Sequence, residues 1–220
     1  MKHLRLPRYG PGARWYDVLS MERLIYRAGR VCGIAFLGLQ RGDRVLDVGC
    51  GTGLNFSFLR TAVGDTGGVV GIDNSTAMLR VARRRIVARN WINVQVVNGD
   101  GGKLSELPLD DRPFDAALFT YSLSVIEDWE SAWTEAVSRL RPGARIAIVD
   151  LALPTGWGRM FSLLARLACF TGHSDPHRAP WDRLIRDTTR ISKAVLRSGH
   201  VHVAAGTVSP TPAGHPTGSP

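Results

Sequence analysis

The chain has 220 residues, of which 44% are hydrophobic and 21% charged, a composition that is typical of one folded domain and excludes a disordered chain. No apolar run near the start approaches the roughly 20 residues that span a bilayer, and no signal-peptide pattern precedes it, so we expect a soluble cytoplasmic protein. Lys and Arg outnumber Asp and Glu by 28 to 19, a formal charge of +9. This charge is equally compatible with a solvated basic surface and with an anionic partner, such as a membrane surface, a nucleic acid or an anionic small molecule.

The two ends of the chain differ in composition from its middle. Residues 1–14 are basic and rich in Pro and Gly, which predicts an irregular arm. Together with the helices expected after it, this arm makes residues 1–40 a segment that covers the site. Residues 207–220 are a Pro/Gly/Ser/Thr tail, which lacks the apolar residues of a core and is expected to be disordered. We therefore expect the folded domain to span 41–206, with a lid or interfacial insertion at about 153–180.

Between the ends, short apolar runs rich in β-branched residues alternate with segments of helical periodicity. This alternation predicts βαβ units and a mostly parallel sheet. Arg141-Pro142-Gly143 is expected to stop a helix and turn the chain into the fifth strand. The predicted strands are 44–48, 68–73, 93–98, 114–120, 144–150, 188–196 and 200–207. The predicted helices are 55–62, 75–88, 130–139 and 181–186.

The last two predicted strands are separated by Ser198-Gly199 and should form a hairpin. The sheet would then have seven strands and an antiparallel last strand, which makes the fold α/β, doubly wound and Rossmann-like. The cysteines, Cys32, Cys50 and Cys169, are widely spaced and form no Cys/His cluster, so we expect neither a disulfide framework nor a metal site.

A glycine-rich segment, Asp47-Val48-Gly49-Cys50-Gly51-Thr52-Gly53, follows the first predicted strand and precedes a helix. Glycines permit unusual backbone dihedrals and close approach of a ligand, and ligands of open parallel sheets lie at the carboxyl ends of strands. The spacing is GxGxG and lacks the third glycine of the dinucleotide fingerprint, which disfavours a pyrophosphate site. The segment therefore predicts a nucleotide-type site of another kind.

Carboxylates follow the next two strands. Asp73 ends the second strand about 20 residues after the glycine turn, where a carboxylate can accept hydrogen bonds from both ribose hydroxyls. Asp100 follows the third strand and can accept a hydrogen bond from an adenine amino group. Either residue alone is as well explained as a helix cap, but their register on successive strand ends favours a binding site.

The glycine turn, Asp73, Asp100 with Gly101, and the Arg141-Pro142-Gly143 turn together resemble the motifs of class I S-adenosylmethionine-dependent methyltransferases over residues 44–150. The resemblance implies a seven-stranded sheet and S-adenosylmethionine as cofactor, with Asp47 and the glycine turn on its methionine part, Asp73 on the ribose and Asp100 on the adenine. The cofactor-binding residues that it implies are Asp47, Gly49, Cys50, Gly51, Thr52, Gly53, Asp73, Asn74, Ser75, Met78, Asp100, Gly101, Thr120 and Tyr121.

The segment after the fourth strand, Phe119-Thr120-Tyr121-Ser122, would lie nearest the methyl group in this family. It lacks the Asn/Asp-Pro-Pro-aromatic sequence of base-amine methyltransferases, and Cys50 lies inside the cofactor turn rather than where a carbon-5 pyrimidine enzyme needs its nucleophile. Nucleic acid is therefore not expected as substrate, despite the basic charge.

A finer resemblance favours a lipid acceptor. Trp15-Tyr16-Asp17, Tyr26-Arg27, Gly53-Leu54-Asn55-Phe56 and the run from Tyr121 to Trp129 are similar to bacterial phosphatidylethanolamine N-methyltransferases and to enzymes that methylate betaine-lipid headgroups. This resemblance implies N-methylation of an aminolipid headgroup by a cytoplasmic protein in peripheral contact with the inner face of an anionic membrane.

Two segments have the pattern of an interfacial helix. In residues 21–39, arginines 23, 27 and 30 recur at helical spacing, and in residues 157–170 two arginines lie on one face among bulky apolar residues. A lid helix packed on the domain explains the second segment equally well.

Tyr16, Tyr121 and Asp17 are the candidate catalytic residues, because an amine acceptor must be neutral when it attacks and tyrosine faces attract a methylated ammonium. Packing alone also explains the tyrosines, and His173 and His177 are read as surface residues. Three alternatives stay open: a soluble small-molecule methyltransferase of the quinone or secondary-metabolite type, a cofactor-binding protein without catalysis, and a nicotinamide oxidoreductase.

Overall fold

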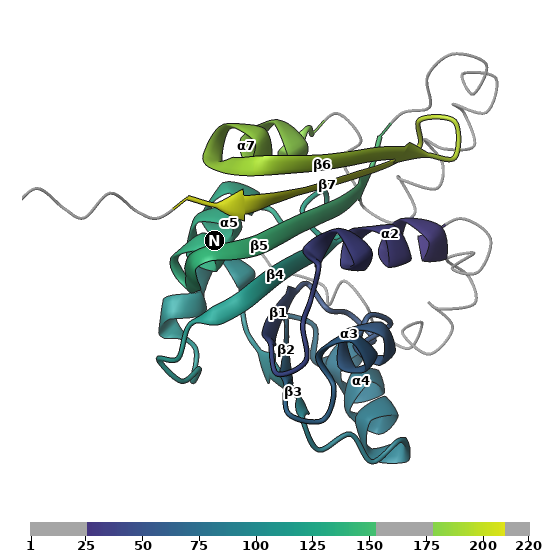
Figure 1. Cartoon of the computed structure of the whole chain (residues 1–220). Coiled ribbons are helices and arrows are strands. Elements are labelled where there is room, and N and C mark those ends of the chain that lie inside the picture. Colours follow the sequence, from purple (N-terminus) through teal and green to yellow (C-terminus); the bar gives the residue numbers. More distant parts are fainter. Residues whose placement is uncertain (1–25, 153–177, 210–220) are drawn as a thin grey trace, which may run out of the picture.

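The computed structural model describes residues 26–152 and 178–209. They form an α/β fold around a seven-stranded sheet with the strand order β3-β2-β1-β4-β5-β7-β6 (Figure 1). Both the strand number and the mostly parallel architecture predicted from the sequence are confirmed. The parallel strands are β1 (Arg44–Val48), β2 (Gly68–Asp73), β3 (Val94–Asn98), β4 (Phe114–Thr120) and β5 (Leu140–Leu151).

The sheet ends in an antiparallel hairpin. Strand β7 (Val201–Val208) runs antiparallel to both β5 and β6 (Thr188–Leu196), between which it is inserted. Thr207 pairs with Arg145, in agreement with the strand predicted at 200–207, and the strand extends to Val208, which we expected in the tail. Val208 belongs to the strand because it pairs with Thr188 of β6.

Helices cover both faces of the sheet. One face is covered by α2 (Arg27–Leu37), α3 (Phe56–Val63) and α4 (Thr76–Ala88), which contribute residues to one buried apolar cluster. The other face is covered by α5 (Trp129–Ser138), α7 (Pro180–Asp187) and the 3₁₀ helix η3 (Gly101–Glu106), whose buried residues form a second cluster with Leu46, Ile72 and Phe119. The fold is therefore doubly wound, as predicted.

Strand β5 differs from its predicted start at residue 144. It begins at Leu140, opposite Phe114, and its register with β4 shifts before Arg145 pairs with Ala116. The expected turn Arg141-Pro142-Gly143 is thus an irregularity within the strand, where Gly143 has a φ of +76° and Pro142 brings no N–H to the ladder.

Several predicted features lie outside the described residues: the arm, the candidate helix at 157–170, His173, His177 and most of the tail. Of the helix expected at 21–39, the described part runs from Arg27 to Leu37 and ends at Gly38, whose φ is +60°. Within residues 26–152 and 178–209, no helix has the length and apolarity needed to cross a bilayer. The same residues contain no group of three or more potential metal ligands.

Candidate functional site

The glycine turn joins β1 to α3 and packs tightly on one side only. Gly49, Gly51 and Gly53 all have positive φ, at +73°, +54° and +77°. A Cβ on Gly49 would lie 2.4 Å from the Cβ of Ser122, whereas a Cβ on Gly51 would meet nothing within 4 Å. The turn therefore lets the loop after β4 approach on one side and leaves open space beside Gly51.

Asp73, at the end of β2, faces this turn. Its Oδ2 accepts a hydrogen bond from the Gly51 N–H and its Oδ1 accepts one from the Ser75 N–H, both at 2.8 Å. Burial raises the pKa of this carboxyl, and the two backbone hydrogen bonds act in the opposite direction. Each carboxylate oxygen keeps a further lone pair, so Asp73 can still accept the two hydroxyls of a ribose.

Ser75 and Met78 have structural roles beside Asp73. The Ser75 hydroxyl caps α4 by accepting a hydrogen bond from the Met78 N–H, and the Met78 side chain is buried under the start of the helix. Asn74, between Asp73 and Ser75, is exposed. Asn74 is therefore the member of this predicted group whose side chain is free of the helix cap and the core.

A buried polar cluster surrounds Asp47 near the end of β1. The Asn55 Nδ2 donates to both carboxylate oxygens of Asp47, at 2.8 and 2.9 Å, and lies 3.2 Å from the Thr120 Oγ1. Arg30 Nη1 donates to the Asn55 Oδ1 at 2.6 Å. Helix α2, the start of α3 and the end of β4 thus bring one polar side chain each to the carboxyl end of β1.

Burial controls the chemistry of Asp47. The carboxyl has no exposed surface, and its pKa is raised to about 7, because burial disfavours the charged form more strongly than Asn55 and Arg30 favour it. In this arrangement Asp47 has no surface open to a ligand, so it acts through Asn55 and the backbone of the turn. Direct contact of Asp47 with the methionine part, as the resemblance implied, does not follow from this geometry.

Sequence reasoning missed Arg30 and Asn55 as site residues. Arg30 was assigned to an interfacial stripe, but it is buried on the face of α2 that also holds Gly29, Gly33 and Ile34. That prediction was wrong for Arg30, because its charge turns inward to the Asn55 amide. The position of Arg30 among buried small and apolar residues at helical spacing was the signal that could have found it.

Asp100 lies at the same edge of the sheet but is exposed. Its Oδ1 accepts the Gly102 N–H at 2.9 Å and caps η3, which is the alternative weighed for it from the sequence. Gly101 lies close to β1, since a Cβ there would be 2.8 Å from Val48 Cγ1. Asn98, two residues before Asp100, donates its side-chain amide to the Asp73 carbonyl, which links the ends of β2 and β3.

Tyr121 is held against α2. It has a φ of +55°, its hydroxyl donates to the Tyr26 carbonyl at 2.8 Å, and the two rings lie 4.9 Å apart. The Arg30 guanidinium lies 5.6 Å from the Tyr121 ring centroid. Tyr121 therefore joins the loop after β4 to α2. The other two catalytic candidates, Tyr16 and Asp17, lie outside the described residues.

A second buried carboxyl, Asp150 at the end of β5, holds the loop after β4. It accepts hydrogen bonds from the Ser124 N–H and hydroxyl, at 2.8 and 2.6 Å, and burial raises its pKa. Arg178 donates to the carbonyls of Leu123 and Ile126 in the same loop. No local pattern in the sequence indicates this role of Asp150, because Ser124 lies 26 residues away along the chain.

Part of the chain is similar to known methyltransferases. Residues 45–143 match the family model described as a methyltransferase domain. The fold is similar to the crystal structure of a SAM-dependent methyltransferase from Aquifex aeolicus, with a TM-score of 0.66, 21% identity and coverage of 89% of this chain and 98% of that one. Residues 45–143 are therefore similar to a methyltransferase domain, and the chain shares the fold of this S-adenosylmethionine-dependent methyltransferase.

Two curated relatives are methyltransferases of naphthoquinones. The 2-phytyl-1,4-naphtoquinone methyltransferase of Synechococcus elongatus is 35% identical over 59% of this chain and 55% of its own length. The demethylmenaquinone methyltransferase of Listeria monocytogenes is 32% identical over 58% of this chain and 54% of its own length. The chain thus matches about half the length of these relatives. They are not aminolipid enzymes, so the finer resemblance drawn from the sequence gains no support from them.

Proposed function

We propose that the protein transfers a methyl group from S-adenosylmethionine to a small acceptor of the quinone type. The named activities of the two curated relatives support the acceptor class. The single observation that supports S-adenosylmethionine as the methyl donor is the rim formed by Asp73, Gly51 and Ser75. In this rim a carboxylate oriented by two backbone N–H groups borders open space at the carboxyl ends of β1 and β2.

These residues fit the cofactor. Asp73 would hold the ribose, the backbone at Gly51 would lie along the methionine part, and Asn74 and Asp100 would border the adenine. The bound cofactor supplies an electrophilic methyl group on its sulfonium. Arg30 and Asn55 keep the end of β1 in place beneath it, so the protein's contribution is mainly to fix the geometry of the two reactants.

The loop after β4 would position the acceptor. Ser122 donates to the Val48 carbonyl at 2.9 Å, Ser124 is held by Asp150, and Tyr121 is held by Tyr26. A loop anchored at three successive points has little freedom and can present the acceptor in line with the methyl group. Tyr16 and Asp17 stay proposed as groups that take a proton from the acceptor.

The aminolipid reading is the second candidate. It is supported by the adjacent rings of Tyr26 and Tyr121, because aromatic faces attract a methylated ammonium. The Arg30 guanidinium over the Tyr121 ring weighs against it, since this ring already faces one cation. A protein that binds the cofactor without catalysis is distinguished from both by the absence of turnover on any acceptor.

The test combines binding with methyl transfer. Calorimetric titration with S-adenosylhomocysteine is made on the wild type, on Asp73→Ala and on Asp65→Ala, whose carboxyl is exposed and paired with Arg60. Transfer of labelled methyl is then followed with a dihydroxynaphthalene and with phosphatidylethanolamine. Binding lost only in Asp73→Ala, with label in the naphthalene product, supports the proposal. Label in phosphatidylethanolamine alone would replace it by the aminolipid reading, and wild-type binding by Asp73→Ala would refute the assigned cofactor site.

A further inference from the structure

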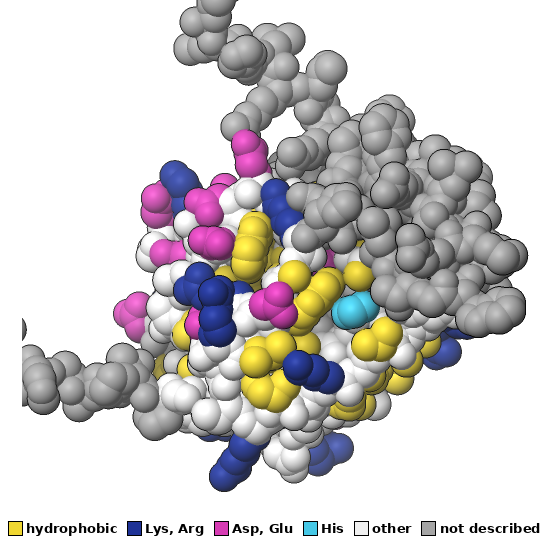
Figure 2. Space-filling view, turned by 90° about the horizontal axis from the view of Figure 1, so that it is seen from above, with side chains coloured by type: hydrophobic (Ala, Val, Ile, Leu, Met, Phe, Trp, Pro, Cys, Tyr) yellow, Lys and Arg dark blue, Asp and Glu magenta, His cyan; other side chains and the backbone are white. Residues whose placement is uncertain are grey.

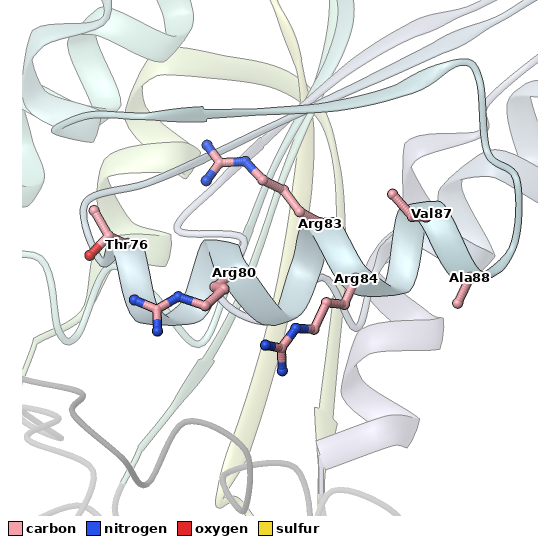
Figure 3. Close-up of a pocket in the computed structure, with 6 residues that line it drawn as sticks. All are labelled: Thr76, Arg80, Arg83, Arg84, Val87 and Ala88. Atoms are coloured by element: carbon pink, nitrogen blue, oxygen red, sulfur yellow. The ribbon is translucent and has the colours of Figure 1, made fainter.

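The outer face of α4 is a basic surface that the proposed reaction does not use. The helix holds four arginines and no acidic residue. Arg80, Arg83 and Arg84 are exposed, whereas Met78 and Leu79 of the same helix are buried. Figure 3 shows their guanidinium groups extending away from the helix axis, with Thr76 at the start of the helix and Val87 and Ala88 at its end. We call the residues of this face and the turn that follows the α4 surface: Thr76, Arg80, Arg83, Arg84, Val87, Ala88 and Ile92.

Arg80, Arg83 and Arg84 have no acidic partner in the described part of the chain. The ion pairs found there involve other basic residues: Arg44, Arg60, Lys103, Arg141 and Arg183. The charge of the α4 surface is therefore balanced by solvent ions, which an anionic partner can displace. A pocket of about 580 Å³ runs along this surface, lined by Thr76, Arg80, Arg83, Arg84, Val87 and Ala88.

Apolar side chains are exposed at the end of the same helix. Val87 is 79% and Ile92 is 89% exposed, the two highest values among the large hydrophobic residues that the structure describes. Between them, Arg89 lies over the Trp91 ring at 5.2 Å. Arginines next to exposed aliphatic and aromatic groups form the pattern of an element that lies in a membrane interface.

We propose that the α4 surface docks onto an anionic phospholipid bilayer. Arg80, Arg83 and Arg84 contact lipid phosphates, and Val87 and Ile92 enter the boundary between headgroups and acyl chains. A nucleic acid backbone would satisfy the arginines but would leave both aliphatic side chains in water, so the charge and the apolar groups together favour lipid. Neither of the two interfacial helices considered from the sequence includes these residues. The inference goes beyond the proposed reaction and is independent of the acceptor.

Vesicle binding by the full chain tests the proposal. The vesicles are phosphatidylcholine with about 30% phosphatidylglycerol, against phosphatidylcholine alone. The test variant is Arg80→Gln/Arg83→Gln/Arg84→Gln. The matched control is Arg186→Gln/Arg190→Gln/Lys193→Gln, on α7 and β6 at the opposite edge of the sheet, and each variant lowers the formal charge from +9 to +6. Figure 2 shows that the face over α7 and β6 mixes basic and acidic side chains.

The expected result is a selective loss. At roughly fivefold per arginine near an anionic surface, the test variant should lose about 100-fold in affinity for the anionic vesicles, and the control less than about threefold. Val87→Ser/Ile92→Ser should lose about tenfold without a change in salt dependence, because it removes no charge. Titration with S-adenosylhomocysteine verifies that each variant is folded.

Three results would overturn the proposal. Equal losses in the test variant and the control would mean that net charge alone governs binding. Wild-type vesicle affinity in the test variant would exclude the α4 surface. Tighter wild-type binding to duplex RNA than to anionic vesicles at the same salt concentration, lost in the test variant, would assign the surface to nucleic acid.

Discussion

Replacing Asp47 with Asn tests the buried carboxyl at the end of β1. Asp47 has no exposed surface, and its pKa rises from 3.8 to about 7 on folding because burial disfavours its charge. The folded protein therefore holds a proton that the unfolded chain has lost between about pH 4 and 7, so the free energy of unfolding falls as the pH rises through this window. The linkage cost of this group is about 2 kcal/mol at pH 5 and about 4 kcal/mol at pH 8.

Urea unfolding from pH 5 to pH 8 measures this cost. Between these limits the wild type should lose about 2–3 kcal/mol more stability than Asp47→Asn, which has a similar shape but does not titrate. Asp150, whose pKa is also raised by burial, titrates in both proteins and cancels in the difference. The charge of Asp73 raises the pKa of Asp47, so this repulsion forms part of the effect that the substitution removes. Parallel curves for the wild type and Asp47→Asn would refute the reasoning.

Three further variants test other parts of the site. Asn55→Ala leaves Asp47 and Arg30 without their shared buried partner. The free energy of unfolding in urea should therefore fall by about 3 kcal/mol, and calorimetry should show S-adenosylhomocysteine binding weakened by about tenfold. A stability loss below about 1 kcal/mol would contradict the buried cluster. Gly49→Ala should lower the free energy of unfolding, measured thermally, by about 3 kcal/mol, because the new Cβ would overlap Ser122. Gly51→Ala should lower it by only about 1 kcal/mol, because only the positive φ is unfavourable there. Equal losses in the two variants would contradict the packing described. Asp150→Asn should lower kcat about tenfold through a looser acceptor loop while cofactor affinity changes less than about twofold, and a reversed pattern would place Asp150 at the cofactor instead.

The strands and the glycine turn were predictable because their signals are local. The runs at 44–48, 68–73 and 114–120 match β1, β2 and β4 residue for residue, since β-branched and apolar residues bounded by turn residues specify buried parallel strands. The irregular start of β5 was not predictable, because Pro142 and Gly143 argue locally for a turn, and pairing of Leu140 with Phe114 extends the strand past them.

Charged side chains were harder to assign than backbone elements. Arg30 has the spacing of a solvated stripe, yet it is buried, because the strongly polar ends of Asp47 and Asn55 lie under α2 and compensate its desolvation. Asp100 was expected at the adenine, and its carboxyl caps η3 in addition to lying at the rim. In both residues the partner, rather than the residue type, determines the role.

The sequence by itself determined the α/β class, the seven strands, the glycine turn and the placement of Asp73 at a strand end, because these follow from residue patterns within one or two neighbouring elements. Only the tertiary structure decided that α2, α3 and β4 converge on Asp47, that Asp150 holds the loop after β4, and that the arginines of α4 face outward next to Val87. These features depend on contacts between residues far apart in the chain. They also depend on how deeply each side chain is buried, because burial raises the pKa of a carboxyl whereas an exposed arginine stays in solvent.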